Sequence, residues 1–407
     1  MAAEAWFDAR EELADVIDVS AEISRLEAAR FRGVAAWAVG GTRSQRGPVR
    51  VLPGQEQMVQ LGGAGSPAVP EFLAAELGPT LGLSAWAAQS LLADALSLVH
   101  RLPHLLEALD SGVAEVWKVR MVAAGTRGLS ETTTRIVDCH LANPARDGVK
   151  PPIARITRSR LQQVISQYDY LDQADDESAE ARTAHALSQR FLRVQHGLDG
   201  TADLTGRLSS EVAERLEQAV EDIATEMADT EDDTRPRQVR RAEALGRLVV
   251  HPGLAQTVLY VHLDHATGTW SADNLGAIDQ TEAEHLVGHG NVTIKPVIDL
   301  AHEITATGYA SPPRLREQLR LAQHDTCAFP YCDRRAAKRA DVDHVIPYDS
   351  GGATSSENTH LLCRYHHRVK THGRWKATKT APGTTRWTSP TGQIFEVAHG
   401  LTTRLRT

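Results

Sequence analysis

The chain has 407 residues, of which 42% are hydrophobic and 24% charged, an ordinary composition for a globular protein with material for more than one domain. Its first residues carry acidic groups early and lack a basic and apolar leader, and no run approaches ~18 uninterrupted apolar residues. We therefore expect no secretory signal, no membrane partner and a cytoplasmic location in which thiols stay reduced.

The formal net charge of −8 is distributed unevenly. From residue 314 onward there are sixteen Lys and Arg against eight Asp and Glu, whereas the preceding residues hold twenty-eight basic and forty-four acidic groups. A polyanion would be repelled by the first part and attracted by the second. An acidic helical domain has many explanations, but the basic C-terminal part indicates a nucleic-acid partner.

Hydrophobic periodicity predicts a mainly α protein with small β elements, beginning with a large helical domain over residues 1–313. Ser84 is expected to cap a helix that Pro103 ends, and helical patterns continue toward Gly112 and Gly125. A Gly-rich stretch at about 40–70 predicts a loop insertion, and linkers are expected at about 143–152 and 228–237. The first helix should present an apolar stripe of Leu13, Val16, Ile17, Ile23, Leu26 and Phe31.

Short β elements are expected inside and after this helical domain. Residues 190–208 predict a hairpin that turns at Gly197 and Gly200, and a long amphipathic helix follows it. After the Ser-Pro-Pro of 311–313 comes one more short helix. A separate C-terminal module is expected over 314–376, and the alternating tail of 377–407 predicts a β-meander in which Trp375 and Trp387 pack against its sheet.

Three of the four cysteines fall close together near the C-terminus. Cys327 and Cys332 form one short knuckle, and Cys363 with His366 forms a second after a longer insert. Two such knuckles supply the four ligands that a tetrahedral structural Zn²⁺ requires. His367 and His372 are alternative fourth ligands, but His366 keeps the two-residue gap. A disulfide between Cys327 and Cys332 is the competing interpretation, and the missing secretory signal argues against it.

The insert between the knuckles contains Asp343 and His344 at the end of a β-type segment, a Gly-Gly loop, and then Asn358. This order, with His367 after the second knuckle, resembles the ββα-metal fold of HNH endonucleases. Hydrolysis of a phosphodiester needs an activated water, and a neutral imidazole such as that of His344 can act as general base near physiological pH.

By that resemblance, Asp343 and His367 hold one catalytic Mg²⁺ or Mn²⁺, which stabilises charge on the leaving oxygen. Asn358 is then expected to hydrogen-bond the loop and orient His344, and the products should carry 5′-phosphate and 3′-hydroxyl ends. Basic residues around and beyond the second knuckle predict a track that contacts DNA phosphates without reading sequence, although each alone could be a solvated surface group. They are Arg364, Arg368, Lys370, Arg374, Lys376 and Lys379.

The whole chain, from about residue 20 to 397, resembles the actinobacterial repeat-family proteins that join a helical domain of unknown function (number 222) to an HNH C-terminus. The segments that carry the resemblance are 69–109, 198–220 and 324–375. The sequence departs from the family in its Gly-rich insertion and in His324, where an Arg is common. The resemblance implies no defined role for the helical domain, which could clamp DNA, form homo-oligomers or bind a protein partner.

The leading hypothesis is therefore a metal-dependent DNA endonuclease. A zinc-dependent DNA-binding protein that has lost catalysis is the first alternative, and an HNH nuclease that acts on RNA is the second.

Overall fold

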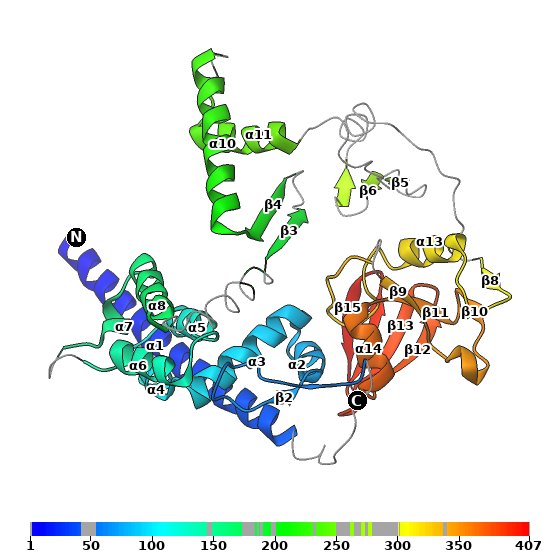
Figure 1. Cartoon of the computed structure of the whole chain (residues 1–407), viewed down its shortest axis with the longest axis horizontal. Helices are drawn as coiled ribbons and strands as arrows, with labels where there is room; N and C mark the ends of the chain where they lie inside the picture. Colours follow the sequence, from blue (N-terminus) through cyan, green and yellow to red (C-terminus); the bar gives the residue numbers. More distant parts are fainter. Residues whose placement is uncertain are drawn as a thin grey trace. The chain divides into compact units, whose positions relative to one another are not determined.

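A computed structural model of the chain shows a mainly α protein with small sheets and a β-rich C-terminal tail, which confirms the predicted fold class (Figure 1). In the described part of the chain, no helix combines the length and apolar character needed to cross a bilayer. The chain divides into two compact units, Met1–Asp175 with Ile298–Thr407, and Asp176–Val297. The structure describes residues 2–41, 54–144, 149–172, 184, 187, 190–196, 201–230, 233–249, 261–263, 270–272, 276–278, 300, 302–336 and 340–406.

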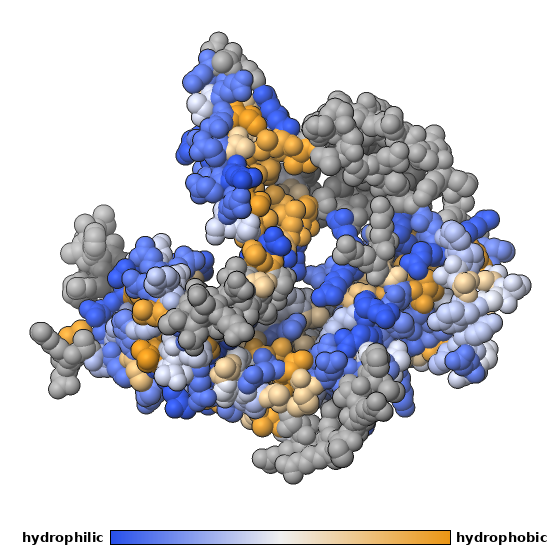
Figure 2. Space-filling model, viewed as in Figure 1, coloured by the Kyte–Doolittle hydropathy of each residue, from blue (hydrophilic) through white to orange (hydrophobic). Residues whose placement is uncertain are grey.

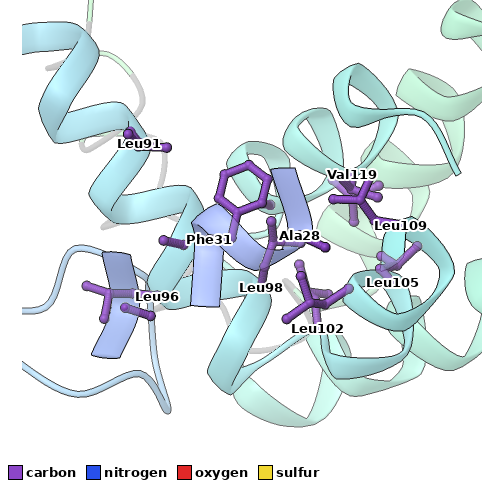
Figure 3. Close-up of a cluster of buried hydrophobic side chains, with 14 of the residues drawn as sticks. Ala28, Phe31, Leu91, Leu96, Leu98, Leu102, Leu105, Leu109 and Val119 are labelled. Carbon is purple, nitrogen blue, oxygen red and sulfur yellow. The ribbon is translucent and has the colours of Figure 1, made fainter. Parts of the chain in front are cut away.

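The first unit begins with a helical core. Figure 3 shows Ala28 and Phe31 of α1 beside Leu98 of α3, and all three side chains are fully buried. Ser84 caps α3 by accepting a hydrogen bond from the backbone amide of Ala87, as its position before the apolar run predicts. The helices are α1 (Ala2–Gly41), α2 (Leu73–Leu81), α3 (Ala85–His100), α4 (Pro103–Asp110), α5 (Val116–Gly125), α6 (Glu131–Ala142), α7 (Pro152–Arg155) and α8 (Arg158–Asp172).

The segment before α2 was expected to be a loop, and its described part, from residue 54, contains the short antiparallel strands β1 (Met58–Val59) and β2 (Val69–Pro70). Its turn is fastened to the helical core by the buried guanidinium of Arg101. That group donates hydrogen bonds to the carbonyls of Gly62, Thr126 and Leu129. Burial lowers the pKa of Arg101 to about 10, so the group remains charged at neutral pH. These hydrogen bonds hold the turn between β1 and β2 against the helical core.

The C-terminal part of the first unit consists of two antiparallel strands, a helix and a meander. Strand β9 (Ala340–His344) pairs with β11 (Thr359–Cys363), and α14 (Arg364–His372) follows directly. Helix α13 (Pro313–Ala322) packs on these strands through Leu315 and Leu319, which confirms the expected short helix. The predicted tail is a four-stranded sheet of β12 (Lys376–Ala381), β13 (Thr384–Thr388), β14 (Ile394–Ala398) and β15 (Leu401–Leu405).

The C-terminal module and the N-terminal segment share one core. Phe72 and Ala75 are buried together with Trp387 and Phe395 of the tail sheet. Outside the core, the guanidinium of Arg368 on α14 contacts both carboxylate oxygens of Glu71, at 2.7 and 2.8 Å. Residues 1–175 and 298–407 therefore belong to one compact unit, and the domain boundary expected near residue 313 stays a prediction.

The second unit contains the predicted hairpin and the long amphipathic helix. Strands β3 (Phe191–His196) and β4 (Ala202–Arg207) are antiparallel, while the expected turn at Gly197 and Gly200 lies outside the described residues. Helices α10 (Ser210–Thr230) and α11 (Arg237–Val249) pack through Val220, Ala224 and Ala244. Figure 2 shows apolar side chains gathered on one side of this unit. A three-stranded sheet follows, β5 (Val261–Leu263), β6 (Trp270–Ala272) and β7 (Gly276–Ile278).

Candidate functional site

The four predicted zinc ligands meet in one buried cluster. Their ligand atoms lie within 4.8 Å of one another. The Nδ1 atom of His366 lies 3.6 Å from the sulfur of Cys327 and 3.3 Å from that of Cys363. Four ligands at the usual zinc–sulfur and zinc–nitrogen distances would stand about 3.6 Å apart at the corners of a tetrahedron. The cluster, which also contains Cys332, therefore fits a structural zinc ion.

The chemistry of the donor set supports the same assignment. Burial raises the pKa of the Cys327 thiol, whereas hydrogen bonds from the neighbouring thiols hold the pKa of Cys363 well below its usual value. Three buried sulfurs this close cannot all ionise unless a cation lies between them. The ring of Phe329 stacks on His366 at 4.0 Å and contacts Trp387 at 5.1 Å between centroids, so the cluster sits inside the apolar core.

A second group of polar residues forms between β9 and the neighbouring face of α14. Because side chains alternate along a strand, Asp341 and Asp343 extend from the same side of β9. His367 of α14 meets both, with Nδ1 at 2.8 Å from Asp341 Oδ2 and Nε2 at 3.3 Å from Asp343 Oδ1. A carboxylate behind an imidazole fixes the ring and makes its other nitrogen a better ligand. Asp341 is thus a site residue that the motif did not reveal.

Asp343 is a buried carboxylate whose charge is compensated by protein groups. Its Oδ2 lies 2.9 Å from Nε2 of His360 on the paired strand and 2.8 Å from Nζ of Lys370 on α14. Burial acts to raise its pKa, but the hydrogen bond from His360 and the charge of Lys370 outweigh burial, so the pKa of Asp343 lies below its usual value. The group is therefore a carboxylate at neutral pH, the form that binds a metal ion.

His344, the predicted general base, lies at the end of β9 and is 7% exposed. Its Nε2 atom is 2.9 Å from the hydroxyl oxygen of Thr354, and the ring of Tyr309 stacks on it at 5.3 Å between centroids. Burial lowers the pKa of His344, although the charge of Asp343 acts in the opposite direction. The imidazole is therefore neutral at physiological pH, as a proton acceptor must be.

Asn358 holds the loop that follows His344. Its side-chain amide donates hydrogen bonds to the carbonyls of Ile346 and Ala353, and its oxygen accepts one from the amide of Ile346. Gly352 lies against this clamp, where an added Cβ would come within 2.0 Å of the Ile346 carbonyl. A side chain at Gly352 would therefore displace the loop.

The predicted basic residues occupy different environments. Arg374 and Lys376 are exposed, and Arg364 is exposed while it contacts Asp341 at 3.1 Å. Arg368 binds Glu71, and it also donates hydrogen bonds to the backbone carbonyls of residues 54 and 55. Lys370 is only 12% exposed and donates to the carbonyl of His344 at 2.6 Å as well as contacting Asp343. The side chain of Lys370 thus lies inside the polar group rather than on an outer surface.

The ββα element, the Cys₃His cluster and the adjacent carboxylate and imidazole groups define an HNH-type module. A family model described as "HNH endonuclease" matches residues 327–373. A second model, "Domain of unknown function (DUF222)", matches residues 53–320, which is more than half of the chain. The chain belongs to the DUF222 family and carries an HNH endonuclease domain at its C-terminus, as the sequence resemblance predicted. No curated protein and no solved structure matches it.

Proposed function

We propose that this protein is a metal-dependent endonuclease that hydrolyses DNA phosphodiester bonds with His344 as general base. The observation that supports this most directly is the pair of ligand atoms, Asp343 Oδ1 and His367 Nε2, that lie 3.3 Å apart beside the strand end that carries His344. Two protein ligands suit Mg²⁺, which usually keeps several waters and binds substrate phosphate oxygens as well.

In this proposal the chain's own residues orient and compensate the reacting groups. The Thr354 hydroxyl holds Nε2 of His344 at 2.9 Å, which leaves Nδ1 of a neutral ring to accept the proton of the attacking water. Asp341 fixes the ring of His367, and His360 with Lys370 keeps Asp343 ionised. A bound Mg²⁺ or Mn²⁺ would act as a Lewis acid toward the phosphate and the leaving 3′ oxygen.

The exposed side chains of Arg364, Arg374 and Lys376 are proposed to contact the DNA backbone. Such contacts give affinity without sequence information, and their strength falls steeply with salt. Arg368 forms an ion pair with Glu71, and Lys370 forms one with Asp343. We therefore do not assign these two residues to the DNA-binding surface.

The test is cleavage of supercoiled and linear DNA by the zinc-loaded full chain with Mg²⁺ or Mn²⁺. We expect nicking of the wild type and a loss of about 10²–10⁴-fold in rate for His344→Ala, the usual contribution of a general base. His372→Ala is the matched control, because His372 is exposed at the end of α14 and should leave the rate unchanged.

Zinc content and thermal melting should be the same in all three proteins, so that loss of rate is not loss of fold. Sequenced product ends should show 5′-phosphate and 3′-hydroxyl groups. If the wild type and His344→Ala bind DNA equally and neither cleaves it, the non-catalytic DNA-binding alternative replaces the proposal. Preferential cleavage of a matched RNA would favour the other alternative.

A further inference from the structure

We propose that Tyr309 and Tyr348 form a stacking platform beside His344 that receives an unpaired nucleobase of the DNA strand being cut. This inference rests on the proposed nuclease function and specifies its substrate as single-stranded or locally unpaired DNA. Tyr309 lies outside residues 327–373, which match the HNH model, and inside the DUF222 match, so the site would be completed by a segment that the motif does not include.

Tyr309 reaches the site because its segment pairs with the nuclease loop. Strand β8 (Thr305–Ala306) is antiparallel to β10 (Thr354–Ser355). On the same segment, the backbone carbonyl and amide of Ile304 bind the amide and hydroxyl of Ser356 at 3.0 and 3.1 Å. The backbone carbonyl of Tyr309 lies 3.5 Å from the hydroxyl of Thr354, the group that holds His344. The pairing therefore fixes the position of Tyr309 relative to the general base.

The rings of the platform are ordered by one another but remain open to solvent. Tyr309 is 68% exposed although one face of its ring lies on His344 at an interplanar angle of 18°. Tyr348, which is 39% exposed, contacts the edge of both rings at 5.5 and 5.8 Å between centroids. Ile346, next to them in the loop, is 56% exposed. A large apolar surface thus faces solvent directly at the hydrolytic site.

Stacking on an aromatic side chain is the chemistry by which proteins hold nucleobases without reading their sequence, because every base has a π-face. A base inside a duplex already stacks on its neighbours, so the platform can take only a base that is unpaired or extruded. The ring of Tyr309 lies against His344, the proposed general base. The stacked nucleobase would therefore belong to a nucleotide that adjoins the scissile phosphate. The platform would therefore select DNA whose strand is open where it is cut.

The competing role for Tyr309 is to shield or orient His344 and never to touch DNA. That role requires only the ring face that lies on the imidazole, and an aliphatic side chain could supply much of the same cover. The two roles differ in binding, because only a stacking residue changes the affinity for unpaired bases. Tyr309→Leu keeps a side chain over His344 but removes the aromatic face. Tyr309→Trp keeps an aromatic face.

The experiment measures fluorescence anisotropy of labelled oligonucleotides with the zinc-loaded full chain in Ca²⁺, at fixed salt. The probes are a single strand, its duplex, the same duplex with a central mismatched bubble, and an RNA strand of equal sequence. A second set carries 2-aminopurine, whose fluorescence is quenched by stacking. Tyr170→Ala is the matched control, because Tyr170 is 76% exposed on α8, a helix that contributes no residue to the site.

We expect the wild type to bind the single strand and the bubble more tightly than the duplex. Tyr309→Leu should weaken binding of these two probes roughly 5- to 150-fold, the range that corresponds to one base–aromatic stack. Its affinity for the duplex should not change. Tyr309→Trp should restore both the affinity and the quenching, and Tyr170→Ala should behave as wild type.

Equal affinities of Tyr309→Leu and wild type for every probe would overturn the platform, as would an equal loss on duplex and single strand. Tighter binding of RNA than of DNA would overturn the assignment to DNA. If the Mg²⁺ or Mn²⁺ assay shows no cleavage while quenching of 2-aminopurine still depends on Tyr309, the nuclease function is rejected and the platform is supported. Cleavage by wild type without discrimination between the probes would do the reverse.

Discussion

The cysteine cluster and the group around Asp343 are both built on α14, yet their charges are balanced in opposite ways. The cluster joins three sulfurs and one imidazole inside an apolar core, and the donors need a cation to ionise together. The Asp343 carboxylate already accepts a hydrogen bond from His360 and is paired with the cation of Lys370, both from the chain itself. The first arrangement suits an ion that stays in place, and the second suits an ion that binds and leaves with substrate.

In the proposed arrangement, the adjacent residues His366 and His367 serve different metal sites. The side chain of His366 is 1% exposed and stacks on Phe329, whereas that of His367 is 30% exposed and lies between two carboxylates. Consecutive helical residues point about 100° apart, so one helix turn can serve two metals without sharing a ligand. Substitutions in the cysteine cluster should therefore affect folding, and substitutions in the group around Asp343 should affect catalysis.

The largest expected effect is at the cysteine cluster. Cys363→Ser should lose zinc and unfold the C-terminal module, because apparent zinc-binding energies of about 10–16 kcal/mol are folding energy in such modules. Zinc stoichiometry by mass spectrometry and melting by circular dichroism measure the two consequences. Cys139→Ser is the matched control, since Cys139 is exposed on α6 outside the cluster. Full retention of zinc by Cys363→Ser would contradict the ligand set.

A smaller effect, on metal affinity, is expected at the proposed hydrolytic site when Asp341 no longer fixes the ring of His367. Asp341→Asn weakens the hold on Nδ1 of His367, and we expect about 10- to 100-fold lower affinity for Mn²⁺ with zinc content unchanged. Electron paramagnetic resonance of free Mn²⁺ in a titration of the zinc-loaded protein measures this affinity. Asp349→Asn, an exposed carboxylate in the following turn, is the control. Unchanged Mn²⁺ affinity in Asp341→Asn would remove Asp341 from the site.

Much of this arrangement follows from local pattern. Cysteine spacing predicted the four clustered ligands, and alternation in the tail predicted the meander that buries Trp387. His360 was missed because its role depends on strand register, in which it stands opposite Asp343. Had the pairing of 340–344 with 359–363 been assumed, a histidine facing the motif aspartate would have been evident.

Other features depend on contacts between distant segments, which periodicity does not report. The first helix was expected to have one apolar stripe, but only Phe31 of that stripe is buried. Its remaining positions lie outside the buried face formed by Ala28, Phe31 and Ala35, and they are 52–62% exposed. They are Leu13, Val16, Ile17, Ile23 and Leu26. The position of Arg368 was equally hidden, since its partner Glu71 lies 297 residues away.

The contact between Arg368 and Glu71 distinguishes the fold-supporting side of α14 from the hydrolytic side. Both side chains are about a quarter exposed, and Glu71 raises the pKa of Arg368. Arg368→Met should lower the free energy of unfolding by about 1–2 kcal/mol in urea melts, because it leaves a partly buried carboxylate unpaired. Combined with Glu71→Gln, the loss should be less than additive. An additive cycle, or a loss of DNA affinity with unchanged stability, would mean that Arg368 serves the substrate.

The smallest expected effect concerns the positive charge of Lys379, which we expect to lower the stability of the folded protein. Lys379 on β12 is half-buried near His360, and burial lowers its pKa from 10.5 to about 8. Its charged form is thus disfavoured in the folded state, so the cost to stability is present below pH 8 and disappears as the pH rises toward 10.5. The full shift corresponds to about 3 kcal/mol, and residual solvent contact reduces our expectation to about 1 kcal/mol. Lys379→Met should therefore stabilise the protein by that amount at pH 7 and by less at pH 9.5, as measured by urea melts at both values. If the gain in the free energy of unfolding is the same at both pH values, packing is responsible rather than the buried charge of Lys379.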